Sequence, residues 1–244
     1  MFSNGTITSV DKYLAIVLDD TVRLVDSDEL HEKITSASVI HIFGAGVNQE
    51  KPAHKAVHEL SARGWAVAPI HPRDAGATIS GFPIRPSIDN GVTPEIVVLF
   101  LAPERARGVV RSLIINQDPS NFPLVWFQHG AEDEDAISAL KEMDADYVID
   151  DCIVVNSNTN NLLCRNSILP QTWCLQIASE DGDGCSVWSV HSSEITELET
   201  PSTDLEWVGS MSDLESSNHT IPRYIRSLKQ ESETILQLAN RLAN

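Results

Sequence analysis

Two glycines, Gly44 and Gly46, interrupt the chain directly after the apolar run Val39–Phe43. A helical pattern begins a few residues later, at Ala53. In the order strand, glycine turn and helix, backbone N–H groups point toward a helix N-terminus, whose dipole favours an anion. The turn, including Ala45, is therefore predicted to bind phosphate.

The spacing supplies only part of a dinucleotide fingerprint, because Gln49 holds the third glycine position of G-x-G-x-x-G. The next segment adds support: a helical stretch at Ala53–Ala62 ends before Gly64, and a second apolar strand, Ala66–Ile70, follows. Strand, turn, helix and strand make one βαβ unit. The alternative interpretation is an α/β domain with tight turns and no ligand.

Charge limits the kinds of partner. The formal net charge of −18 makes attraction to nucleic acid or to an anionic membrane unfavourable. An anionic ligand must therefore be held locally, and Lys51, Lys55 and Arg73 are the cations near the turn. No apolar run approaches the ~20 residues of a membrane span, and Met1–Asp11 lacks a secretory pattern. We expect a cytoplasmic protein.

Other reactive side chains are expected to be structural. His54 and His58 share one face of a predicted helix, which we interpret as a solvated face and not a metal site. The acids of Glu132–Asp135 suit a helix N-terminus, and His129 is a weaker candidate for a base. Four cysteines form no C-x-x-C pair. We predict no catalytic residue and no metal ligand.

The positioning elements predict an α/β fold, because strand-like and helical segments alternate up to residue 151. The expected architecture is a Rossmann-like, doubly wound, parallel sheet of five strands. The expected strands are Val39–Phe43, Ala66–Ile70, Ile96–Leu101, Leu124–Phe127 and Tyr147–Ile149, and the expected helices are Ser27–Thr35, Ala53–Ala62, Pro103–Ile115 and Glu132–Met143.

Three regions are predicted: an N-terminal extension over residues 1–25 with a hairpin within 6–25, the Rossmann-like domain over 26–155, and a C-terminal extension over 156–244. The polar tract Asn156–Asn161 is interpreted as the linker. The stretch Asn166–Pro222 contains no Lys or Arg and 10 acids, which suits a solvated face or a basic partner.

Within the acidic C-terminal extension we expect a β-hairpin formed by Thr172–Ile177 and Cys185–Val190. Trp173 and Trp188 are predicted to pack across this pair. An amphipathic helix is expected over Ile221–Leu242, packing on its own chain or, alternatively, on a protein partner or in a homodimer.

The order of these motifs resembles the CoA-binding domain family, Rossmann-like proteins related to the CoA-binding domain of succinyl-CoA synthetase and ADP-forming acyl-CoA synthetases. The resemblance covers about Glu29 to Val155. It is carried by Gly44-Ala45-Gly46 with Lys51-Pro52, by Val67–Pro72, by Gly81–Ser87, by Glu95–Phe100, by Val125–Gly130 and by Asp150–Cys152.

The resemblance implies a ligand, coenzyme A or an acyl-CoA, and a place for each part of it. The residues implied to face the phosphates are Gly44, Ala45, Gly46, Lys51 and Pro52; those at the adenosine and its 3′-phosphate are His71, Pro72 and Arg73; those along the pantetheine arm are Leu101, Ala102, Pro103 and Gln128.

The segment at the end of the second predicted strand weighs against NAD. A dinucleotide fold places an acid at the end of strand two for the ribose 2′-OH, whereas this chain has Ile70-His71-Pro72-Arg73 there. A cation suits a ribose phosphate, which CoA and NADP share. We expect a non-catalytic or regulatory CoA-binding protein; the alternatives are an NADP-dependent oxidoreductase or redox sensor, and the CoA-binding subunit of a split acyl-CoA ligase.

Overall fold

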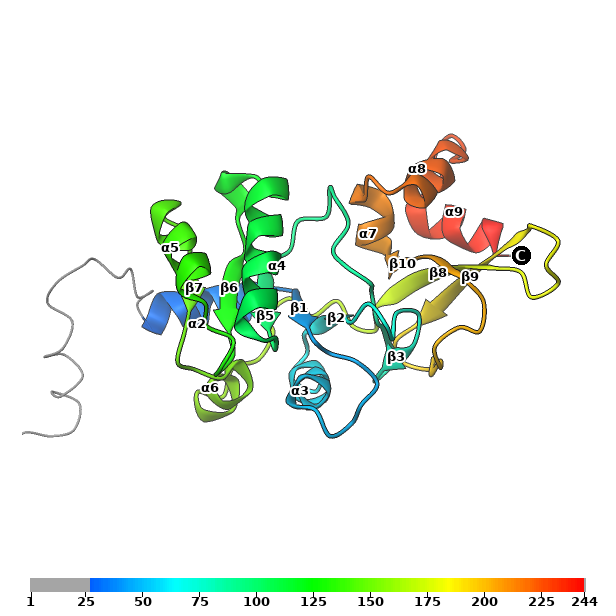
Figure 1. Ribbon diagram of the computed structural model, residues 1–244. Coiled ribbons are helices and arrows are strands. Elements are labelled where there is room, and N and C mark those ends of the chain that lie inside the picture. The colour runs from blue at the N-terminus through cyan, green and yellow to red at the C-terminus, as the bar shows by residue number, and fades with distance from the viewer. Residues whose placement is uncertain (1–26, 244) are drawn as a thin grey trace, which may run out of the picture.

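The centre of the fold is a five-stranded, all-parallel sheet, seen in the computed structural model that describes residues 27–243 (Figure 1). Its strands lie in the order β2 (Ala66–Ile70), β1 (Val39–Phe43), β5 (Ile96–Leu99), β6 (Leu124–Phe127) and β7 (Tyr147–Val148). The chain passes from β1 to β2 on one side and then returns to β5 on the other, so the winding reverses between β1 and β5. The predicted doubly wound parallel sheet is confirmed.

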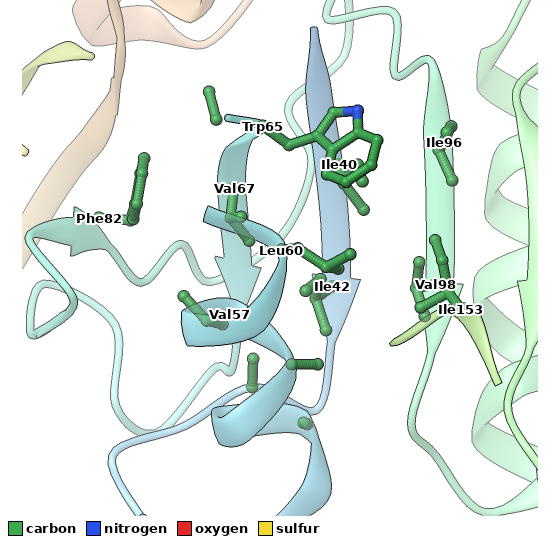
Figure 2. Packing of buried hydrophobic residues seen from close by; sticks show 14 of the residues in the cluster. Ile40, Ile42, Val57, Leu60, Trp65, Val67, Phe82, Ile96, Val98 and Ile153 are labelled. Atoms are coloured by element: carbon green, nitrogen blue, oxygen red, sulfur yellow. The ribbon is translucent and has the colours of Figure 1, made fainter. Parts of the chain in front are cut away.

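Helices cover both faces of this sheet, with α4 and α5 above it and α3 and α6 below it in Figure 1. The helices are α2 (Ser27–Ser36), α3 (Pro52–Ser61), α4 (Pro103–Asn116), α5 (Glu134–Glu142) and α6 (Ile153–Thr159), with a 3₁₀ turn at Pro119–Asn121. Figure 2 shows Leu60 of α3 next to Ile42 of β1, whereas Val57 of the same helix lies toward β2. Apolar burial on both faces explains why the strands are apolar runs without alternation.

Most predicted elements of this domain agree with the structure within one residue at each end. The exceptions have local causes. The α5 helix begins at Glu134 because the Asp133 side chain accepts from the Ala136 N–H at 3.0 Å and caps it. The third strand ends at Leu99, because Ala102 and Pro103 already start α4.

The predicted linker is wrong. Asn156–Asn161 lies largely within α6, where Ser157 is fully buried and Asn156 Nδ2 donates to Asp151 Oδ2 at 2.7 Å. A boundary at residue 155 would therefore fall inside a helix, and the division into three regions stays a prediction. The predicted N-terminal extension and its hairpin lie outside the described residues.

The C-terminal part is larger than the predicted hairpin and helix. Its antiparallel sheet has the order β10 (Leu205–Ser210), β8 (Thr172–Ala178) and β9 (Ser186–Ser192). The single predicted helix is wrong: three short helices follow, α7 (Met211–Ser216), α8 (Thr220–Ser227) and α9 (Ile235–Leu242). Ile225 of α8 and Leu238 of α9 are buried in their own chain.

The two hairpin tryptophans do not pair with each other. Trp188 stacks on Trp207 of the unpredicted strand β10, with ring centroids 6.0 Å apart, whereas Trp173 lies 4.4 Å from the His191 ring. Trp173 Nε1 also donates to the Gly81 carbonyl, in the turn between β3 (Thr78–Ile79) and β4 (Phe82–Pro83). Trp173 therefore fastens the C-terminal sheet to the first domain.

A buried ion pair makes the second connection. Arg85, which follows β4, donates from Nε and Nη2 to Asp213 Oδ2 of α7 at 2.9 and 2.7 Å. The Asp213 carboxylate also accepts from the Ser210 N–H at 2.8 Å. Burial alone would raise the pKa of Asp213, but the Arg85 charge holds that pKa below its usual range.

No helix within residues 27–243 is long and apolar enough to cross a membrane.

Replacing Asp213 with Asn should lower the free energy of unfolding by about 3–5 kcal/mol, because it leaves the buried Arg85 charge uncompensated. Urea denaturation measures this. Glu32→Gln is the matched control: it breaks the Arg165–Glu32 pair, whose side chains are 57% and 58% exposed, and should cost less than about 1 kcal/mol. Equal losses in the two variants would contradict the role of the pair.

His41 of β1 predicts a pH dependence. Burial, followed by the nearby Arg85 charge, lowers its pKa from 6.5 to about 4. The unfolded chain then binds a proton that the folded one does not, so stability falls by about 3 kcal/mol as the pH drops from 6.5 to 4. Replacing His41 with Phe should remove most of the change in the urea midpoint between pH 6.5 and pH 4. An unchanged slope would show that His41 is not responsible.

Candidate functional site

The glycine turn sits at the carboxyl edge of the sheet, where the winding reverses. Gly44 has a φ of +90°, and a Cβ there would lie 2.3 Å from the Phe100 carbonyl oxygen after β5. The Gly44 N–H donates to the Ile70 carbonyl at 2.9 Å. Only glycine allows this backbone to pass between the ends of β2 and β5.

Two histidines support the turn, so their prediction as a solvated face is wrong for His54. His54 is 7% exposed, and its Nδ1 lies 2.9 Å from the Gly46 carbonyl oxygen. His54 Nε2 contacts His58 Nε2 at 3.2 Å, and His58 Nδ1 contacts Ser80 Oγ at 2.5 Å. The chain of polar contacts from Ser80 to Gly46 holds the turn against α3.

A cavity of about 210 Å³ opens at this edge. Five predicted site residues share its wall: Gly44, Lys51, Pro52, Leu101 and Gln128. They come from the ends of β1, β5 and β6 and from the start of α3. Ala53, Phe100, His129 and Ala131 complete the lining, and of these only His129 was singled out from the sequence, as a weak candidate base. Ala102 and Pro103 follow Leu101 directly, at the start of α4.

Gln128 is the polar group of most interest in this cavity. Gln128 is only 5% exposed, and its Nε2 has no hydrogen-bond partner among residues 27–243. Buried amide donors are usually paired, and an unpaired one costs about 1–3 kcal/mol. A ligand that supplies an acceptor here would recover that cost.

Donors for an anion lie next to the cavity. In the described part of the chain, the N–H groups of Ala45 and Gly46 donate to no protein acceptor. The α3 helix begins after Lys51 without a side-chain cap, so its first N–H groups are also open. Lys51 is exposed, and its side chain forms no ion pair within residues 27–243.

The segment after β2 lies on the other side of the turn. The His71 ring lies 3.0 Å from where a Gly46 Cβ would be. Arg73 is exposed. Pro72 lines a different cavity, of about 300 Å³, shared with Trp207 and Asp89. Within residues 27–243, no Lys or Arg lines that larger cavity, so this lining does not suit a phosphate.

The sequence analysis did not predict Asp74 as a residue of this site. Its Oδ2 accepts from the Val47 N–H at 2.9 Å and lies 3.1 Å from His71 Nδ1. Sequence reasoning looked for an acid directly at the end of β2, whereas Asp74 comes four residues later. The turn over residues 72–76 folds it back onto the glycine turn.

One group of side chains could hold a metal ion. His129, Glu132 and Asp150 each offer a ligand atom, and these atoms lie within 4.8 Å of one another. Glu132 also accepts from the Gly130 N–H at 2.7 Å. His129 and Asp150 are exposed, and the group comprises only three donors, so it specifies no particular metal.

Comparison with known proteins identifies the domain that carries this cavity. Residues 38–158 match the sequence profile of the CoA binding domain. This segment belongs to the CoA binding domain family. The CoA binding domain thus includes β1 through β7 and most of α6, and the predicted resemblance is confirmed. No curated protein matches the sequence significantly.

Solved structures similar to this one include proteins from three prokaryotes. A Thermus thermophilus protein has 26% identity and a TM-score of 0.49, with 55% of this chain and 98% of that chain covered. A hypothetical protein from Pyrococcus horikoshii OT3 has 22% identity and a TM-score of 0.49, with 58% and 98% covered. A conserved hypothetical protein from Pyrococcus furiosus has 24% identity and a TM-score of 0.44, with 49% and 98% covered.

Replacing Gly44 with Ala should destabilise the protein by about 1–3 kcal/mol, because the new Cβ meets the Phe100 carbonyl at a positive φ. Urea denaturation measures the change. Gly108→Ala is the matched control: it lies in α4 with open space around its Cβ position and should stabilise by up to about 1 kcal/mol. A neutral Gly44→Ala variant would show that the turn is not constrained as described.

Proposed function

We propose that this chain binds coenzyme A or an acyl-CoA at the carboxyl edge of its parallel sheet, in a carrier or regulatory role. Membership of the CoA binding domain family supports CoA binding in general. The observation that carries the specific site is the Nε2 of buried Gln128, which has no partner in the described part of the chain and lies in a cavity also lined by Gly44 and Lys51. A mostly apolar wall with a few converging donors is typical of ligand sites.

Each part of the ligand has a proposed place. The pyrophosphate lies at the glycine turn, where Lys51, the open N–H groups of Ala45 and Gly46, and the start of α3 at Pro52 supply positive charge. The pantetheine arm follows Leu101 and the adjoining residues 102–103 to Gln128, whose Nε2 donates to an amide oxygen of the arm.

The adenosine lies on the other side of the turn, toward His71, Pro72 and Arg73. The C-terminal sheet adjoins this end, because Pro72 and Trp207 share a cavity wall. We therefore propose that the C-terminal part responds structurally when the adenosine end of the site is occupied. This arrangement supports a regulatory role without chemistry at the ligand.

Lys51→Gln should weaken CoA binding about tenfold or more, because a charge-assisted hydrogen bond to phosphate contributes about 1.5–3 kcal/mol. Calorimetric titration with CoA measures the affinity. Lys141→Gln, on the exposed end of α5, removes the same charge far from the turn and should leave the affinity unchanged.

The titration also separates the alternative functions. Absence of CoA binding by the unaltered protein, with clear binding of NADP, would overturn the proposal in favour of an oxidoreductase or redox sensor. Equal weakening by Lys51→Gln and Lys141→Gln would place the phosphates elsewhere. Binding of CoA only in the presence of a second, ATP-dependent protein would indicate a subunit of a split ligase.

A further inference from the structure

Asp74 places a carboxylate on the glycine turn at the position where a nucleotide would approach. Its Oδ2 would lie 2.2 Å from a Cβ on Gly46, so the side chain packs directly on that residue. The Val47 N–H, one of the donors of the turn, already has Oδ2 as its acceptor at 2.9 Å. The anion site of the turn is therefore divided, with the Lys51 side open and the Val47 side closed by a negative charge.

The other oxygen of the carboxylate remains available. Among residues 27–243, the contacts of Asp74 with Val47 and His71 both go to Oδ2, and none goes to Oδ1. The Asp74 side chain is 21% exposed, so Oδ1 can be reached by a ligand hydroxyl. A carboxylate oxygen accepts such a hydrogen bond strongly because it is charged.

Geometry in doubly wound folds indicates which hydroxyl this is. A nucleotide whose pyrophosphate lies at the first glycine turn places its ribose at the end of the second strand, where an acid accepts from the ribose 2′-OH. Asp74 occupies that place by folding back from beyond β2. The same carboxylate repels a phosphate on the ribose, because two like charges a few ångströms apart are unfavourable even near a protein surface.

Neighbouring cations do not remove this repulsion. His71 Nδ1 lies 3.1 Å from Asp74 Oδ2, so this ring already faces the carboxylate before any ligand arrives. Arg73 is exposed to solvent, where its charge is screened by salt and water. On the Val47 side of the turn, Asp74 thus provides the negative charge.

We propose that Asp74 is a specificity residue that accepts a ribose hydroxyl and selects against a phosphorylated ribose. The site then takes adenosine diphosphate derivatives with an unmodified ribose, such as dephospho-CoA, at least as tightly as CoA itself. This inference rests on the proposed function and narrows its ligand class.

The test is calorimetric titration of the full chain and of Asp74→Asn with CoA and with dephospho-CoA at one fixed pH and ionic strength. Asn keeps an oxygen that accepts from the Val47 N–H but carries no charge, so the turn is retained. Asp74→Asn should shift the ratio of the two dissociation constants about tenfold in favour of CoA. Glu59→Gln, an equal charge change on the exposed face of α3, should leave the ratio unchanged.

The outcomes are distinct. A preference of the unaltered protein for CoA over dephospho-CoA, or a ratio that Asp74→Asn does not move, overturns the role of Asp74 while leaving CoA binding intact. An equal shift with Glu59→Gln would reduce the effect to overall charge and overturn it too. Failure of both ligands to bind overturns the proposed function, and this inference with it. Urea midpoints of the variants verify that each is folded.

Discussion

The Arg85–Asp213 ion pair determines how the two parts of the molecule fit together. Arg85 belongs to the first domain through its backbone, since its N–H donates to the Pro69 carbonyl and its carbonyl accepts from His71. Its side chain belongs to the second part, through Asp213 of α7. A buried charge requires a partner with good geometry. The pair therefore fixes the C-terminal part relative to the end of β2, which adjoins the candidate site.

The candidate site depends on a second constraint, the reversal of the sheet between β1 and β5. There the connections leave toward opposite faces, and side chains from the ends of three strands surround one space. Gly44 allows the chain to cross this edge, and His54 holds the following turn through the Gly46 carbonyl. The backbone donors of the turn are thus held in place before any ligand arrives, which reduces the entropy lost on binding.

The two constraints meet in the segment from His71 to Asp74. One hydrogen bond, from the His71 N–H to the Arg85 carbonyl, holds its first residue, and Asp74 closes the Val47 side of the glycine turn. The edge that carries the glycine turn and the C-terminal part are therefore joined by a few residues of one loop. A change in the segment from His71 to Asp74 has a short physical route to Trp207, which shares a cavity wall with Pro72, and through Arg85 to α7.

The sequence by itself determined the parallel sheet, its covering helices and the position of the glycine turn, because apolar runs, turns and helix starts are local patterns that burial on both faces makes unambiguous. It also identified Gly44, Lys51, Pro52, Leu101 and Gln128, which the fold brings to one cavity. Their contact with a ligand stays a prediction, since local sequence carries no information on the ligand's pose.

Only the tertiary structure decided what depends on partners distant in sequence. Strand β10 was not predicted, because its pairing with β8 comes from contacts formed across the fold. The buried state of His54 and the Arg85–Asp213 pair depend on Gly46 and α7, respectively. The role of Asp74 was also not predictable, because a turn after β2 brings its carboxylate to Val47 in the glycine turn, which is distant in sequence. Local propensity determines elements, but the charges and hydrogen bonds of a site are settled by packing.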